Sequence, residues 1–187
     1  MNTPDRSHYL RVTTILYPFS GLKGIDPSVL ASAAERGTKV HEIIDAFEEG
    51  IGLFELELAL KGYFESYTKW ATGKKFLKKP ERFYCDVLKI TGEIDAMYKD
   101  GKDLVIVDYK TPVRESKTWA MQATAYSYLA KQSGYDIKRV EFVKLDKTSK
   151  EPKIYVYEED MDTFKKVLDC YKYFFKEKNE ENILDYV

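Results

Sequence analysis

The sequence predicts an α/β or α+β fold in which helices flank a central mixed β-sheet. Three observations predict it: an apolar stripe at helical spacing in residues 26–50, two strand-like runs around Asp100-Gly101, and further helical and strand-like segments after them. The expected order is two helices, three strands, a helix, two strands and a last helix. The 187 residues contain no repeat and no linker, so we expect one domain over residues 1–187.

The first part of the chain is expected to be irregular up to residue 25 and helical after it. Asp26-Pro27 predicts an N-cap followed by proline at the first helical position, and the apolar stripe continues from there to about Gly50. Gly37 lies inside this helix, where it either permits a close backbone approach or breaks the helix in two. A second helix is expected over about residues 54–71.

The strands are expected in the middle of the chain. Residues 83–90 alternate in a way that lets either face be buried, and residues 91–98 and 104–111 flank the turn at Asp100-Gly101. A helix over about 116–131 precedes a second hairpin formed by residues 139–145 and 153–157. The last helix is expected to start near Asp160 and to end in the charged stretch 176–181.

Composition excludes several classes of protein. The two cysteines, Cys85 and Cys170, are far apart and form no CxxC pair, so a zinc site, an iron–sulfur cluster and a disulfide scaffold are not expected. The sequence shows no secretion signal and no run of 18 apolar residues, so we expect a soluble cytoplasmic protein. The net charge of −1 requires a nucleic-acid binder of this composition to concentrate its positive charge locally.

An acid and a lysine end the most apolar strand. Leu104–Val107 suggests a strand buried on both faces, and Asp108 and Lys110 follow it. Side chains alternate across a strand, so Asp108 and Lys110 point to the same face. Taken alone, this DxK pattern also fits an ordinary salt bridge at a strand end.

A second acid changes that interpretation. Asp95 is expected inside the preceding strand, where a buried charge needs a partner or a metal. The turn at Asp100-Gly101 folds Asp95 back toward Asp108, and two close carboxylates repel each other unless a cation lies between them. Such oxygen-rich sites suit Mg²⁺ or Mn²⁺. The alternative is a solvated edge, or a pair neutralised by Arg or Lys.

Two helical positions complete the candidate site. His41 lies on the first long helix, and an imidazole beside two carboxylates would favour Mn²⁺ or Fe²⁺ over an all-oxygen site. Gln122 and Tyr126 are four residues apart and share a helix face. A lone helical histidine and an amphipathic helix are the simpler interpretations of these residues.

Together these segments resemble the motifs of RecB-type PD-(D/E)XK nucleases. Arg36–His41 resembles the RGTxxH helix, Gly92–Asp95 the GxxD motif, and Asp108–Thr111 the DYKT form of DxK. Gln122 and Tyr126 match the QxxxY motif, and the four motifs occur in the family's order over residues 36–126. The resemblance implies a restriction-endonuclease-like core. Residues 12–20 are also similar to the start of stand-alone nucleases of this kind, many of them from phages, whose place of action would be the bacterial host cytoplasm.

The resemblance also implies a reaction and roles. The expected protein is a metal-dependent DNA nuclease, in the first place an exonuclease, that leaves 5′-phosphate and 3′-hydroxyl ends. The implied metal ligands are His41, Asp95, Asp108 and the carbonyl of Tyr109. The implied catalytic set is Asp95, Asp108, Lys110, Gln122 and Tyr126. The two cysteines cannot supply the four of the iron–sulfur branch, and no phosphate loop of a helicase motor is found.

Local positive charge is expected to bind single-stranded DNA or duplex ends, with affinity that falls with salt. The candidate basic residues are Lys74, Lys75, Lys78, Lys79, Arg82, Arg114 and Lys117. The alternative for the lysine cluster is a solvated face. Trp70 and Trp119 are candidates for base stacking, and packing in the core is the simpler interpretation of both.

Three other functions fit parts of the pattern. A structure-dependent endonuclease would use the same core. A non-catalytic nucleic-acid-binding module would have lost catalytic residues, which the intact His41, Asp95, Asp108 and Lys110 oppose. A carbohydrate hydrolase would use Asp95 and Asp108 as acid and base without a cation. Recombination or replication proteins are possible partners by resemblance.

Overall fold

A computed structural model describes residues 6–51, 56–78 and 82–175, and all structural statements refer to them. The helices are α1 (Val12–Leu16), the 3-10 helix η1 (Tyr17–Phe19), α2 (Pro27–Glu48), α3 (Leu58–Ala71), α4 (Trp119–Gln132) and α5 (Met161–Phe175). The strands are β1 (Leu10–Arg11), β2 (Lys75–Phe76), β3 (Phe83–Cys85), β4 (Ile90–Gly92), β5 (Ala96–Asp100), β6 (Asp103–Lys110), β7 (Ile137–Lys144) and β8 (Lys153–Val156).

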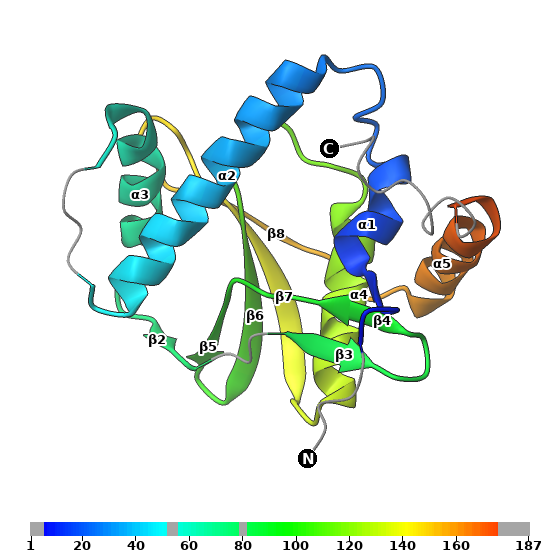
Figure 1. Ribbon diagram of the computed structural model, residues 1–187. Coiled ribbons are helices and arrows are strands. Elements are labelled where there is room, and N and C mark those ends of the chain that lie inside the picture. Colours follow the sequence, from blue (N-terminus) through cyan, green and yellow to red (C-terminus); the bar gives the residue numbers. More distant parts are fainter. Residues whose placement is uncertain (1–5, 52–55, 79–81, 176–187) are drawn as a thin grey trace.

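The strands form two sheets rather than one. The larger has the order β2-β5-β6-β7-β8, in which β6 and β7 are parallel and the other neighbours antiparallel. The smaller has the order β1-β4-β3 and pairs β1 with β4 in parallel. The predicted mixed sheet flanked by helices is therefore confirmed, and Figure 1 shows α2 crossing one side of it diagonally.

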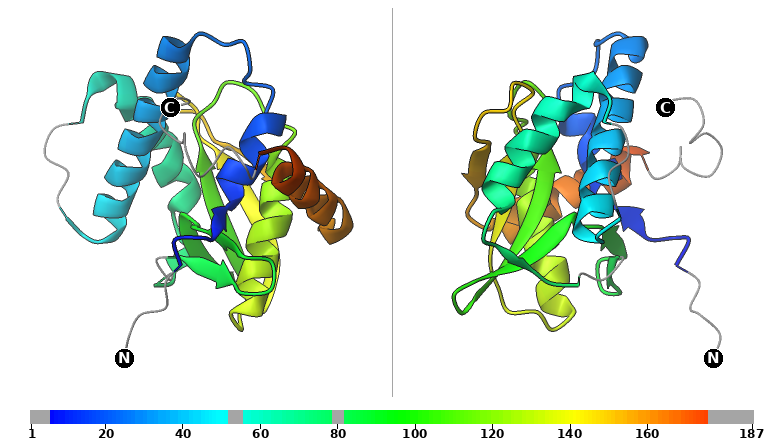
Figure 2. Two further views of the ribbon diagram at one scale, coloured as in Figure 1. Left: turned by 45° about the vertical axis from the view of Figure 1, so that its right-hand side comes forward. Right: turned by 90° about the vertical axis from the view of Figure 1, so that its left-hand side faces the viewer.

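The five-stranded sheet separates two apolar clusters. On β6, Val105, Val107 and Tyr109 belong to the cluster with α2 and α3, whereas Ile106 belongs to the cluster with α1, α4 and α5. Figure 2 shows α2 and α3 side by side over one face of this sheet. The period-2 alternation of a strand thus sends consecutive β6 side chains into different layers.

Helix α2 begins and continues as its sequence predicts. The Asp26 carboxylate accepts a hydrogen bond from Ser28 N–H at 2.8 Å, and Pro27 occupies the first turn. The helix passes through Gly37 unbroken, and a Cβ there would lie 3.6 Å from Thr111 Oγ1. The predicted break is therefore wrong, and the 3.6 Å contact is an ordinary one, so no close backbone approach requires the glycine either.

Two predictions about local structure are wrong. Residues 10–19 form β1, α1 and η1 instead of an irregular segment, because Val12, Ile15 and Leu16 pack into the core from a helix of only five residues. The run 83–90 is broken between β3 and β4, where Lys89 has a φ of 55°.

The bounds of the other predicted elements differ by a few residues. Helix α3 begins at Leu58 rather than near 54, and α4 begins at Trp119 rather than near 116. The predicted hairpins and the start of the last helix are confirmed, whereas the charged end expected at 176–181 lies outside the described residues. In the part of the chain that the structure describes, no helix combines the length and apolarity that a membrane crossing requires.

Candidate active site

The end of β6 carries the DxK pair. Asp108 is buried, with 4% of its surface exposed, and Lys110 Nζ lies 2.5 Å from its Oδ2. Both side chains point to the α4 side of the sheet, as the strand alternation predicts. The Lys110 ammonium is thus the charge that faces the buried Oδ2 atom.

Asp95 contacts β6 from the segment between β4 and β5. It lies outside a strand interior, which corrects the prediction, yet its N–H still bonds to the Val107 carbonyl at 3.1 Å. Asp95 Oδ2 accepts the Tyr109 N–H at 2.6 Å, and Oδ1 lies 3.2 Å from His41 Nδ1. The other ring nitrogen of His41, Nε2, lies 3.1 Å from the Tyr109 carbonyl oxygen. The backbone of Tyr109 therefore contacts Asp95 through its N–H and His41 through its carbonyl oxygen.

Gln122 connects α4 to the DxK pair. Its side-chain oxygen accepts from Lys110 Nζ at 3.2 Å, and its amide nitrogen donates to Asp108 Oδ1 at 3.1 Å. The same nitrogen lies 2.9 Å from the Tyr126 hydroxyl. The QxxxY pattern therefore does more than give the helix an apolar face. Gln122 bonds to both Asp108 and Lys110, and Tyr126 bonds to Gln122.

The charges of the site perturb one another. Burial lowers the pKa of His41, but Asp95 more than compensates and raises it to about 9. Burial also opposes ionisation of Asp95, yet the charge and hydrogen bond of His41 lower its pKa. Burial raises the pKa of Asp108 above its ordinary value, which Lys110 opposes and Asp95 reinforces. Clustered perturbed pKa values of this kind are typical of functional sites.

The donor set fits a divalent cation. The available ligands are the carboxylate oxygens of Asp95 and Asp108, the Tyr109 carbonyl oxygen and one nitrogen of the His41 imidazole. Among the described residues, no three His, Cys, Asp or Glu side chains already converge as a metal cluster. Asp108 turns instead to Lys110, and His41 bridges Asp95 and Tyr109. These cationic side chains neutralise the carboxylates that a metal ion would contact.

Two residues of the predicted basic cluster are engaged within the protein. Lys74 Nζ lies 4.8 Å from the centre of the Trp70 ring, and Arg82 forms an ion pair with Glu93 at 2.5 Å. Lys75 faces Lys99 across β2 and β5, close to the turn that joins β5 and β6. At about 3.3 Å per residue, that turn is roughly 23 Å from the end of β6 that carries Asp108 and Lys110.

The remaining basic candidates have different positions. Lys78 is exposed, and Lys79 lies outside the described residues. Arg114 and Lys117 are exposed on the segment that follows β6, and neither forms an ion pair with a described residue. Of the candidate basic residues, only Arg114 and Lys117 lie within seven residues after Lys110.

Both tryptophans are part of the core. Trp70 and Trp119 are 6% and 4% exposed, and Trp119 stacks on Phe142 with ring centres 5.6 Å apart. The packing interpretation of the two residues is therefore confirmed.

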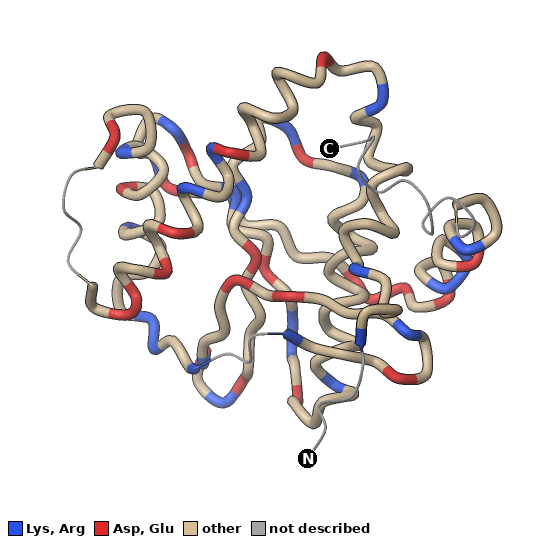
Figure 3. The backbone as a smooth tube through the Cα atoms, in the orientation of Figure 1, with Lys and Arg blue, Asp and Glu red and all other residues tan. Residues whose placement is uncertain are grey.

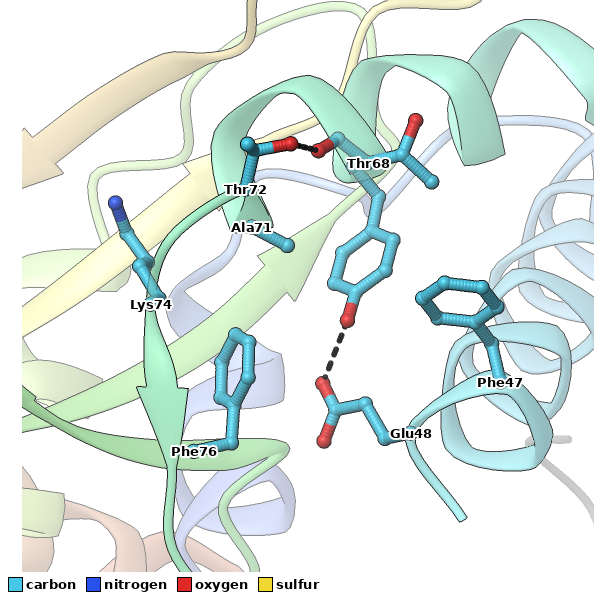
Figure 4. A pocket seen from close by; sticks show the side chains of 8 residues that line it. Phe47, Glu48, Thr68, Ala71, Thr72, Lys74 and Phe76 are labelled. Carbon is cyan, nitrogen blue, oxygen red and sulfur yellow. Dashed lines mark hydrogen bonds between the residues drawn. The ribbon is translucent and has the colours of Figure 1, made fainter. Parts of the chain in front are cut away.

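Sequence reasoning missed one residue of this region. Glu48, at the end of α2, accepts hydrogen bonds from the hydroxyls of Tyr67 and Tyr109, each at 3.0 Å. It borders a pocket of about 360 Å³ between α2, α3 and β2 (Figure 4). The only signal in the sequence is its spacing of seven from His41, which places both residues on one side of the helix.

Comparison with known proteins identifies the family. The family model described as the PD-(D/E)XK nuclease superfamily matches residues 51–181. The chain belongs to the PD-(D/E)XK nuclease superfamily. The matched range contains Asp95, Asp108, Lys110 and Gln122 of the candidate nuclease site, whereas His41 precedes it. The resemblance inferred from the motifs is confirmed.

One solved structure of low sequence identity shares the fold of this chain. A candidate exonuclease from Eubacterium rectale aligns with a TM-score of 0.53 at 14% identity, covering 97% of this chain and 88% of that one. An alkaline exonuclease from Laribacter hongkongensis, LHK-Exo, aligns with a TM-score of 0.47 at 11% identity, covering 94% and 95%. No curated protein matches the sequence.

Proposed function

We propose that this protein is a divalent-metal-dependent deoxyribonuclease, an exonuclease that leaves 5′-phosphate and 3′-hydroxyl ends. One observation carries the proposal: Asp95 and His41 contact the Tyr109 peptide while Asp108 pairs with Lys110, so all these groups meet at one end of β6. Nucleases of the superfamily use divalent metals, and the oxygen-rich donor set supports Mg²⁺ or Mn²⁺ here.

Each residue has a proposed role. A cation would be held by Asp95, Asp108, His41 and the Tyr109 carbonyl. It would polarise the scissile phosphate and make the attacking water more acidic. Lys110 orients that water or binds a phosphate oxygen that gains charge in the transition state. Gln122 and Tyr126 are positioning residues, because Gln122 bonds to both Asp108 and Lys110.

The proposed reaction is a hydrolysis. The water oxygen bonds to phosphorus and the P–O3′ bond breaks. The 3′ oxygen takes up a proton, so one product carries a 5′-phosphate and the other a 3′-hydroxyl. Exposed Arg114 and Lys117, next to the site in the chain, would bind neighbouring phosphates of the DNA. We place this activity in the cytoplasm, which for a phage-encoded protein is that of the bacterial host.

A cleavage assay tests the proposal. End-labelled single-stranded and duplex DNA and a closed circle are incubated with Mg²⁺, Mn²⁺ or EDTA, beside Lys110→Ala and the exposed-lysine control Lys138→Ala. We expect metal-dependent cleavage of linear DNA that Lys110→Ala lowers by roughly a hundredfold or more, in line with loss of a transition-state contact. Lys138→Ala should cut like the wild type.

The other outcomes discriminate between the alternatives. Cleavage of the circle would identify an endonuclease on the same core. DNA binding without cleavage under either metal would identify a binding module. Cleavage that EDTA does not affect would reject the metal-dependent reaction.

A further inference from the structure

Tyr109 connects the candidate metal site to the last turn of α2. Its N–H donates to Asp95 and its carbonyl oxygen lies 3.1 Å from His41 Nε2, so its peptide belongs to the site. Its side chain points to the other layer and is 2% exposed, within the cluster that contains α2 and α3. Any movement of this buried side chain therefore also moves a candidate ligand.

Glu48 fixes the buried end of that side chain. The Tyr109 hydroxyl donates to Glu48 Oε1 at 3.0 Å, and the Tyr67 hydroxyl donates to the same oxygen at 3.0 Å. Tyr67 is 1% exposed and its ring meets that of Tyr109 edge to face, with centres 5.5 Å apart. Buried hydroxyls need such partners, and bonds to a charged acceptor are stronger than neutral ones.

One helix thus contacts the two ends of one tyrosine. Glu48 follows His41 by seven residues, which brings the two side chains to the same side of α2 about 10 Å apart along its axis. His41 contacts the carbonyl of Tyr109, and Glu48 accepts from its phenol. A slide or rotation of α2 over β6 would break both contacts together.

We infer that Glu48 is a positioning residue for the metal site: by holding the Tyr109 phenol, it sets α2 so that His41 and the Tyr109 carbonyl face Asp95. The inference rests on the proposed function for the metal, but the geometry that it predicts is a property of the protein alone. Positioning partners of metal ligands are known to affect affinity strongly, because they restrict ligand orientation.

A purely structural role makes a different prediction. If Glu48 only holds α2 against α3, loss of the Tyr67 bond and loss of the Tyr109 bond should have equal effects. Tyr67→Phe and Tyr109→Phe are a matched pair, because each removes one buried hydroxyl that donates to the same Glu48 oxygen. Glu48 itself is exposed beside the pocket in Figure 4, so its truncation leaves no sealed cavity and the variants should fold.

The first measurement uses the full chain without metal. The imidazole signals of His41 are followed by NMR, with His8, the only other histidine, as the internal reference. We expect Tyr109→Phe and Glu48→Ala to shift the His41 signals and Tyr67→Phe to leave them in place. Glu48→Gln should stay close to the wild type, because an amide oxygen still accepts both hydroxyls. Glu49→Gln, at the exposed neighbouring position, controls for the loss of charge.

The second measurement is Mn²⁺ binding followed by electron paramagnetic resonance. We expect Tyr109→Phe and Glu48→Ala to weaken binding roughly tenfold, the lower end of the range for partners of metal ligands. Tyr67→Phe should stay within about twofold of the wild type, since its bond does not reach a candidate ligand. Thermal unfolding of each variant shows whether a loss of affinity merely follows a loss of stability.

The outcomes separate this inference from the proposed function. Unchanged His41 signals in both Tyr109→Phe and Glu48→Ala would overturn the positioning role, as would equal effects of Tyr67→Phe and Tyr109→Phe. If the His41 signals respond as expected while the wild type neither binds Mn²⁺ nor cuts DNA, the proposed function fails and the positioning of His41 stands.

Discussion

Two motif glycines are required to different degrees by their surroundings. A Cβ at Gly92 would lie 2.9 Å from both Leu129 Cδ1 and Tyr126 Cε1, closer than side chains tolerate. A Cβ at Gly37 would meet Thr111 Oγ1 at 3.6 Å, an ordinary contact. Of the two glycines, only Gly92 lies against Tyr126, which bonds to Gln122. An added methyl group should therefore disturb the site at Gly92 and not at Gly37.

We predict opposite effects for alanine at these positions. Gly92→Ala should lower the free energy of unfolding by about 1–3 kcal/mol, the usual cost of overpacking. It should also reduce cleavage, because the Tyr126 ring, whose hydroxyl accepts a hydrogen bond from Gln122, must shift. Gly37→Ala should keep stability or raise it by up to about 1 kcal/mol through helix propensity. Urea denaturation and the cleavage assay measure both effects, and equal stability of the two variants would contradict the argument.

Local sequence patterns identified the residues of the candidate site, but not the contacts that join them to residues far away in the chain. Asp108 and Lys110 were predictable as a pair because the strand alternation is local, and Asp95 was predictable because the Asp100-Gly101 turn folds it back. Glu48 was not predictable, since its partner Tyr109 is 61 residues away and no local rule brings them together. Gln122 joined the implied set only through the family's motif order, and no local rule predicts its bond to Lys110.

At the scale of elements, one carboxylate connects α4 to the start of α5. Glu159 Oε1 accepts from Ser127 Oγ and from Lys131 Nζ, each at 2.6 Å. The neighbouring Asp160 N–H donates to Thr124 Oγ1 at 3.1 Å. Burial would raise the pKa of Glu159, but the hydrogen bonds from Lys131 and Ser127 lower it.

This connection should depend on pH in a defined direction. Because its pKa is lower in the folded protein, ionised Glu159 stabilises the fold fully at pH values above its ordinary pKa of 4.5. This stabilisation is lost as pH falls through the lower pKa of the folded state. At pH 7, Glu159→Gln should lower the free energy of unfolding by less than about 1 kcal/mol, because the pair is largely solvated.

Urea unfolding of the wild type and Glu159→Gln between pH 7 and pH 3 measures this effect. The difference between wild type and Glu159→Gln should narrow as pH falls below 4.5. Glu158→Gln at the exposed neighbouring position is the control. A difference that grows toward acid pH would contradict the predicted sign.

The elements themselves were predictable in proportion to their length. The 22-residue helix α2 and the eight-residue strand β6 carry enough periodicity to be recognised. Helix α1 has five residues and β1 and β2 have two each, so tertiary contacts decide their structure. The single domain expected over residues 1–187 remains a prediction.

At the scale of the whole molecule, charge is mixed rather than segregated. The net charge is −1, and Figure 3 shows basic and acidic residues interspersed along most elements. Two of the expected DNA-binding cations are engaged within the protein, Lys74 with the Trp70 ring and Arg82 with Glu93. Local cations next to the site should therefore determine affinity for DNA.

Salt dependence tests this expectation, because each phosphate contact adds to the slope of log K against log salt. We predict that Arg114→Ala/Lys117→Ala reduces the magnitude of that slope by about 1.5–2, whereas Lys74→Ala leaves it nearly unchanged. Fluorescence anisotropy of labelled DNA in EDTA measures binding without cleavage. Because Lys74 faces the Trp70 and Tyr98 rings, its ammonium is already stabilised by the protein. A larger slope change for Lys74→Ala than for the double variant would instead place the DNA along β2.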